Sequence, residues 1–82
     1  MGNGYNGWKN RQTWNVALWI NNEEPLYRAA VEFMANYNGR APYKAFIKRE
    51  GLKGGRTPDG IAWDGTRLDY TALNEMMKEL VD

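Results

Sequence analysis

Basic side chains gather in residues 40–56, in a pattern suited to binding an anion. Lys44 and Lys48 stand four positions apart, so a helix would place both on one side. Several cations on one face raise the local potential and attract phosphate groups. The segment has six basic residues against the single acid Glu50, and these are Arg40, Lys44, Lys48, Arg49, Lys53 and Arg56. The composition therefore predicts an anion-binding surface.

Two aromatic residues and a glycine pair would complete such a surface. Tyr43 and Trp63 are the aromatic residues expected to stack on a base. Gly54-Gly55 would bring backbone N–H groups close to a phosphate, although the Gly-Lys-Thr of a P-loop does not follow them. The predicted ligand-binding residues are Arg40, Tyr43, Lys44, Lys48, Lys53, Arg56 and Trp63.

The same charges also have a purely structural interpretation. Residues 57–82 carry six acidic residues against two basic ones, and the net charge of the whole chain is only +1. The lysines and arginines of 40–56 would then form the solvated face of a short helix, partly paired with these acids. Nucleic-acid-binding domains are usually more basic than this chain.

Catalysis and metal binding have little support in the sequence. The chain contains no Cys, His or Ser, so the usual nucleophiles and zinc ligands are missing. Asp59, Asp64 and Asp69 are spaced by five, which is not the pattern of an EF-hand loop, and each has a local role in a turn or a helix cap. We expect no enzyme, metal site or cofactor, and keep a carboxylate-based hydrolase as a third hypothesis.

The elements that position these residues are predicted to be helices. Asn10 and Asp69 are typical N-cap residues, Pro25 and Pro42 suit the first turn of a helix, and Gly51 ends one. The fold class is therefore all-α, a compact single domain with one long ordered loop between the third and fourth helices. The predicted segments are an irregular lead-in over 1–9 and helices over 11–21, 25–38, 42–50 and 70–81.

The first predicted helix is apolar on nearly every side. Such a helix is normally buried all round, which a domain of 82 residues achieves with difficulty. We expect Trp14 in the core. Either this is the central helix of the domain, or one of its faces, around Val16, Trp19 and Ile20, contacts a partner. This pattern predicts a second function, namely a protein-interaction or homodimerisation module.

Two stretches resemble a known family. Residues 5–22 read YNGWKNRQTWNVALWINN, and residues 57–76 contain TPDG, then Trp63, then LDY and LNEM. Together they resemble a family of small uncharacterised proteins from cyanobacteria, other bacteria and bacteriophages. The resemblance implies a compact, mainly helical domain of prokaryotic or phage origin, and it implies no activity.

The sequence thus favours a non-enzymatic binding domain for nucleic acid or a nucleotide. A protein partner or homodimer is the alternative, and a phage-type inhibitor or counter-defence role would fit either function by analogy. The chain has no apolar run long enough for a membrane span and no signal peptide, so we expect a cytoplasmic protein with no membrane partner.

Overall fold

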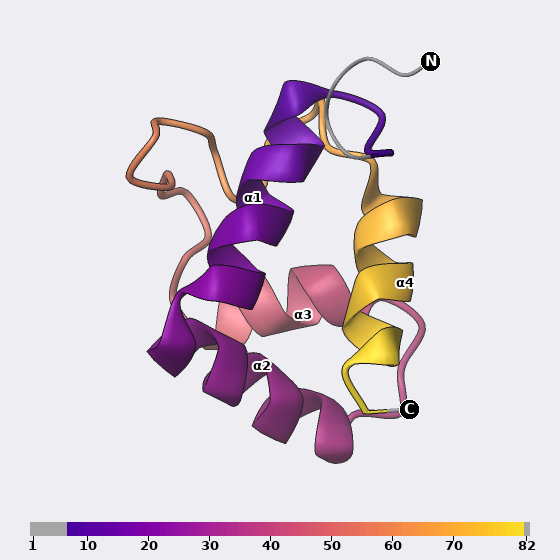
Figure 1. The fold of residues 1–82 in the computed structure, drawn as a ribbon. Helices are drawn as coiled ribbons and strands as arrows, with labels where there is room; N and C mark the ends of the chain where they lie inside the picture. Colours follow the sequence, from indigo (N-terminus) through magenta and orange to yellow (C-terminus); the bar gives the residue numbers. More distant parts are fainter. Residues whose placement is uncertain (1–6, 82) are drawn as a thin grey trace.

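Four helices make up the regular structure of residues 7–81, the part of the chain that the computed structural model describes (Figure 1). They are α1 (Arg11–Asn22), α2 (Glu24–Ala35), α3 (Pro42–Arg49) and α4 (Tyr70–Glu79). No strand occurs in 7–81, only one isolated bridge between Arg56 and Ala62. The all-α prediction is confirmed. The first six residues of the lead-in, with Tyr5, lie outside the described part.

Asn10 starts α1 and also ties it to the start of α4. Its carboxamide oxygen accepts hydrogen bonds from the backbone N–H of Thr13, at 2.9 Å, and from the Thr13 hydroxyl. Its amide group donates to the carbonyl of Arg67, and the Thr13 hydroxyl accepts from the N–H of Asp69. Asp69 in turn caps α4 through the N–H of Ala72. The two helices therefore begin from one shared network.

α2 ends earlier than predicted, at Ala35 rather than at 38. The side chain of Asn36 donates to the Glu32 carbonyl, and asparagine side chains of this kind compete with helix continuation. Tyr37 stacks on Phe33 with ring centroids 5.0 Å apart, so the chain folds back instead of extending the helix. Gly39 lies against the Tyr37 hydroxyl, where a Cβ atom would clash.

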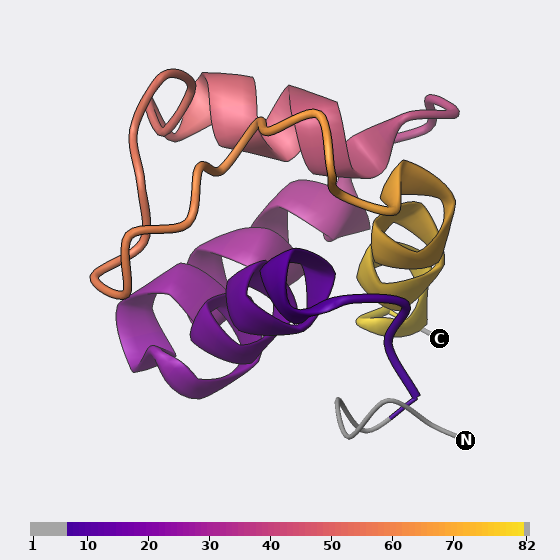
Figure 2. The same ribbon diagram turned by 90° about the horizontal axis from the view of Figure 1, so that it is seen from above.

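The helices enclose one hydrophobic core. α1 packs against α2, α3 packs against α4, and Figure 2 shows α3 lying across the layer formed by α1 and α2. Large side chains that are fully buried come from three of the helices and include Ile20, Tyr43, Phe46, Ile47, Leu73 and Met77. This packing fixes α3, and with it the lysines on its outer side.

The inward face of α1 differs from the prediction. Val16 and Ile20 are both 0% exposed and belong to the core, whereas Trp14 is only half-buried and lies outside the core cluster. Because α1 is apolar on nearly every side, helical periodicity alone does not determine which side packs inward. The partner-contact face predicted around Val16 and Ile20 is therefore wrong.

A long loop connects α3 to α4 and packs along the side of α1 and α3 (Figures 1 and 2). Its two halves pair across Thr57 and Ile61, through a 2.7 Å backbone hydrogen bond, and across Gly55 and Trp63. Gly60 closes the turn at the tip by donating to the Thr57 carbonyl, with the positive φ of 89° that favours glycine. The loop is thus a hairpin-like segment held by its own hydrogen bonds, in agreement with the long ordered loop that the sequence predicted.

A polar network holds the tip of this loop on α1, and it is buried at Asn15 and Thr57 and exposed at Asp59. Asn15, 1% exposed, accepts a hydrogen bond from the Thr57 hydroxyl at 2.7 Å and donates to the Asp59 carboxylate at 2.8 Å. The indole N–H of Trp19 donates to the same carboxylate oxygen at 2.9 Å. These two hydrogen bonds lower the pKa of Asp59, because both stabilise its charged form.

Candidate functional site

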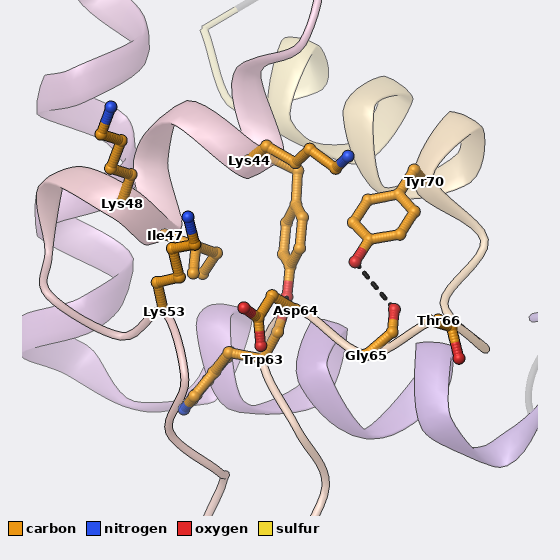
Figure 3. A pocket seen from close by; sticks show the side chains of 10 residues that line it. Lys44, Ile47, Lys48, Lys53, Trp63, Asp64, Gly65, Thr66 and Tyr70 are labelled. Carbon is orange, nitrogen blue, oxygen red and sulfur yellow. Dashed lines mark hydrogen bonds between the residues drawn. The ribbon is translucent and has the colours of Figure 1, made fainter.

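A pocket of about 440 Å³ lies between α3, the two ends of the long loop and the first residue of α4 (Figure 3). Its volume falls in the range typical of small-molecule sites. Lys44 and Lys48 come from α3, and Lys53 follows the helix, so three cations border one space. The full lining is Tyr43, Lys44, Ile47, Lys48, Lys53, Trp63, Asp64, Gly65, Thr66 and Tyr70.

The lysines of this pocket form no ion pair with the acidic side chains of residues 57–81. Within residues 7–81, the one ion pair is Arg28 with Glu24 on α2. Lys48 and Lys53 are exposed, and in that part of the chain neither is paired with a carboxylate. The charge pairing that the structural interpretation predicted is therefore absent from the described residues, although the Asp64 carboxylate lies in the same pocket.

Tyr43 and Trp63 line the pocket from within the core rather than as exposed stacking platforms. Tyr43 is 0% and Trp63 4% exposed, and the Tyr43 hydroxyl donates to the Trp63 carbonyl at 2.6 Å. Burial raises the pKa of Tyr43 well above its usual range. The predicted base-stacking role of both residues is thus wrong, because the small domain uses their rings as core.

Tyr70 is the half-buried aromatic residue of the pocket, and the sequence analysis missed it. The Lys44 ammonium lies 4.9 Å from the centre of its ring, in cation–π contact, and its hydroxyl donates to the Gly65 carbonyl. Burial, and then the nearby Asp64 carboxylate, raise the pKa of Tyr70. The sequence feature that could have identified Tyr70 is its position directly after the N-cap residue Asp69, on the first turn of α4.

The glycine pair does not offer free N–H groups to a phosphate. The N–H of Gly54 donates to the Asp64 carboxylate at 3.3 Å, and the N–H of Gly55 donates to the Leu52 carbonyl at 2.9 Å. Gly54 has a φ of 82°, so glycine is required there by the backbone conformation. The pair therefore shapes the loop and brings Asp64 into the pocket.

Two of the predicted binding residues lie outside the pocket. Arg40 is exposed in the segment between α2 and α3, before the first residue of α3. Arg56 donates to the Gly60 carbonyl within the loop and borders a different, shallower depression. The structure thus brings together Tyr43, Lys44, Lys48, Lys53 and Trp63 of the predicted set, and separates Arg40 and Arg56 from them.

The two sequence motifs meet in the fold. Asn10, Thr13 and Asn15 of the first motif bond directly to the loop and to α4, where the second motif lies. The chain belongs to DUF7249, a family of unknown function. The family model matches residues 1–82. No curated protein and no solved structure shows a significant match to the chain.

The three evenly spaced aspartates take separate structural roles in this member of DUF7249. Asp59 binds Asn15 and Trp19, Asp64 accepts from Gly54, and Asp69 caps α4. Among residues 7–81, no group of three or more His, Cys, Asp or Glu side chains converges in a way that could hold a metal ion.

Residues 7–81 also contain no helix with the length and apolarity of a membrane span.

Proposed function

We propose that this protein is a non-catalytic domain that binds a small anionic ligand, of the nucleotide class, in the pocket beside α3. The observation that carries the proposal is the set of Lys44, Lys48 and Lys53 around an apolar-walled cavity, without carboxylate pairing of Lys48 and Lys53 in the described residues. Three cations attract phosphate groups, and the half-buried ring of Tyr70 is the aromatic surface that a flat organic group in the pocket would meet. The proposal includes the cytoplasmic location expected from the sequence.

The size of the site favours a monomeric ligand over a nucleic-acid chain. Polymer binding needs basic residues that continue along the backbone track, with aromatic platforms for successive bases. Arg40 and Arg56 would extend such a track, yet they lie outside the pocket, and Tyr43 and Trp63 are buried. A single confined basic cluster is the arrangement expected for one phosphorylated molecule.

The test is isothermal titration with ATP on the protein and on two charge-matched double variants. Lys48→Gln with Lys53→Gln removes two pocket cations, and Arg40→Gln with Arg56→Gln removes two cations outside it. We expect the lysine variant to weaken binding at least ten-fold, since a pair of unit charges about 4 Å apart contributes about 1 kcal/mol even when fully screened by water, and two such pairs are lost. The arginine variant should lose less than three-fold. Equal losses, or no binding by the unaltered protein, would refute the proposal.

A further inference from the structure

Asp64 is the one carboxylate that lines the lysine pocket, and its place there is unexpected for a site that binds only an anion. It lies in the loop segment after Trp63 and shares the pocket with Lys44, Lys48 and Lys53 (Figure 3). Yet no ion pair joins it to any of these lysines. A carboxylate in this position would repel a simple inorganic anion and weaken its binding.

The hydrogen-bonding capacity of Asp64 is largely unused. Among residues 7–81, its carboxylate accepts one hydrogen bond, from the Gly54 N–H at 3.3 Å, which is long for a charge-assisted bond. An ionised carboxylate offers about four acceptor sites and no donor. The Asp64 side chain is exposed, so a ligand in the pocket can reach these remaining sites.

The field of Asp64 acts on the aromatic side of the pocket. The negative charge raises the pKa of Tyr70 and adds to the raised pKa of Tyr43, in each case after the larger effect of burial. The Lys44 ammonium lies over the Tyr70 ring, so the aromatic side carries positive charge as well. The pocket therefore combines the positive charges of its three lysines with one negative charge, that of Asp64. A ligand that matches both has an anionic group and a hydrogen-bond donor within one small molecule.

We infer that Asp64 is a specificity residue, which selects a nucleoside polyphosphate over a bare polyphosphate by accepting a hydrogen bond from the base or the ribose. This inference rests on the proposed function, because it needs the lysines to hold the phosphates. Discrimination arises because a donor on the ligand compensates the carboxylate, whereas an inorganic anion only meets its repulsion.

The experiment compares ATP with inorganic tripolyphosphate by isothermal titration, on the protein, Asp64→Asn and the control Glu50→Gln. Glu50 is an exposed acid that does not line the pocket, so both variants change the net charge equally. We expect Asp64→Asn to weaken ATP about five-fold and to tighten tripolyphosphate about three-fold, while Glu50→Gln changes both ligands alike. Asp64→Ala, which removes every acceptor, should weaken ATP further.

The outcomes separate the inference from the proposed function. If Asp64→Asn tightens both ligands, or behaves as Glu50→Gln does, Asp64 is merely repulsive and the inference fails, although the pocket still binds anions. If the unaltered protein binds neither ligand, the proposed function itself fails. If a single-stranded oligonucleotide binds more tightly than ATP, the ligand is a polymer and the inference is overturned.

Discussion

Individual side chains in this fold carry more than one role, and Tyr43 shows it most clearly. Its ring is part of the core, its hydroxyl fixes the Trp63 carbonyl, and its backbone N–H donates to the Asn74 side chain at 3.0 Å. One residue thus connects α3 to the loop and to α4. The pocket lies directly over this connection, so its floor is as rigid as the core.

The buried hydroxyl of Tyr43 should make the folding stability of the protein fall at alkaline pH, and replacing Tyr43 should reduce that fall. Because the pKa of Tyr43 is raised in the folded protein, the unfolded chain ionises first, and stability is lost as the pH rises above the ordinary value of 10.0. Tyr43→Phe should cost about 1–2 kcal/mol at neutral pH, since the Trp63 carbonyl loses its donor. It should also lose less stability than the unaltered protein between pH 9 and 11.

Urea unfolding at pH 9 and at pH 11 measures this loss of stability, with Tyr27→Phe as the control. Tyr27 is exposed on α2, so its hydroxyl does not face the core. An equal alkaline loss in Tyr43→Phe and in the unaltered protein would contradict the role given to the Tyr43 hydroxyl.

At the scale of elements, the network of Asn15, Thr57, Asp59 and Trp19 holds the long loop on α1. The loop supplies Lys53, Trp63 and Asp64 to the pocket, so the network positions half of the site from a distance. Asn15 satisfies both ends of its amide group inside the protein. The polar residue on an apolar helix is thus explained by the loop that covers it.

Asn15→Ala should destabilise the protein by about 2–4 kcal/mol, because the Thr57 hydroxyl and the Asp59 carboxylate lose partners and a cavity is left. Asn22→Ala, at the exposed end of the same helix, should change stability by less than about 0.5 kcal/mol. Thermal unfolding followed by circular dichroism compares the two variants. A loss in Asn15→Ala no larger than in Asn22→Ala would show that the network does not hold the loop.

The hydrogen bonds of Asp59 should make the attachment of the long loop to α1, and with it the stability of the fold, weaker at acidic pH. Its pKa is lowered by the hydrogen bonds from Asn15 and Trp19, so the stability it contributes is present above the unfolded value of 3.8. That stability is lost as the pH falls below this value through the lower pKa of the folded state. Asp59→Asn should therefore show a smaller decline in melting temperature between pH 5 and 3 than the unaltered protein.

The control for this prediction is Glu32→Gln, which removes an exposed acid of α2. It should leave the acid decline nearly unchanged. The Trp19 indole gives an independent signal, because protonation of Asp59 alters its hydrogen bond and hence its fluorescence. A decline in Asp59→Asn as steep as in Glu32→Gln would contradict the assignment.

At the scale of the molecule, the amphipathic segments and caps were predictable, and the orientation of α1 was not. Asn10, Asp69, Pro25 and Pro42 mark helix starts by local chemistry, which acts within one turn. The inward side of α1 depends on which segments cover it, and besides α2 these include the long loop. The loop residues that contact Asn15, namely Thr57 and Asp59, are more than 40 residues away in the chain. Sequence periodicity contains no such information.

The candidate site also has a part that local sequence predicts and a part that tertiary packing determines. The cations Lys44 and Lys48 were predictable because four-residue spacing determines a shared helix side. The exclusion of Arg56, the burial of Trp63 and the entry of Tyr70 depend on how the long loop folds back between α3 and α4. Arg40 is excluded because it lies before the first residue of α3. A local pattern therefore identified the charged side of the pocket, and tertiary packing determined the rest.

Nucleotide binding in the pocket beside α3 can be followed by the backbone amide shifts in a nitrogen-15 NMR titration with ATP. We predict saturable shifts concentrated in residues 43–48, 53–55, 63–66 and 70, weakening as salt is raised. Lys48→Gln with Lys53→Gln should abolish them. Shifts that are absent, or that fall mainly on the outer side of α1 around Trp14 and Leu18, would contradict nucleotide binding in this pocket.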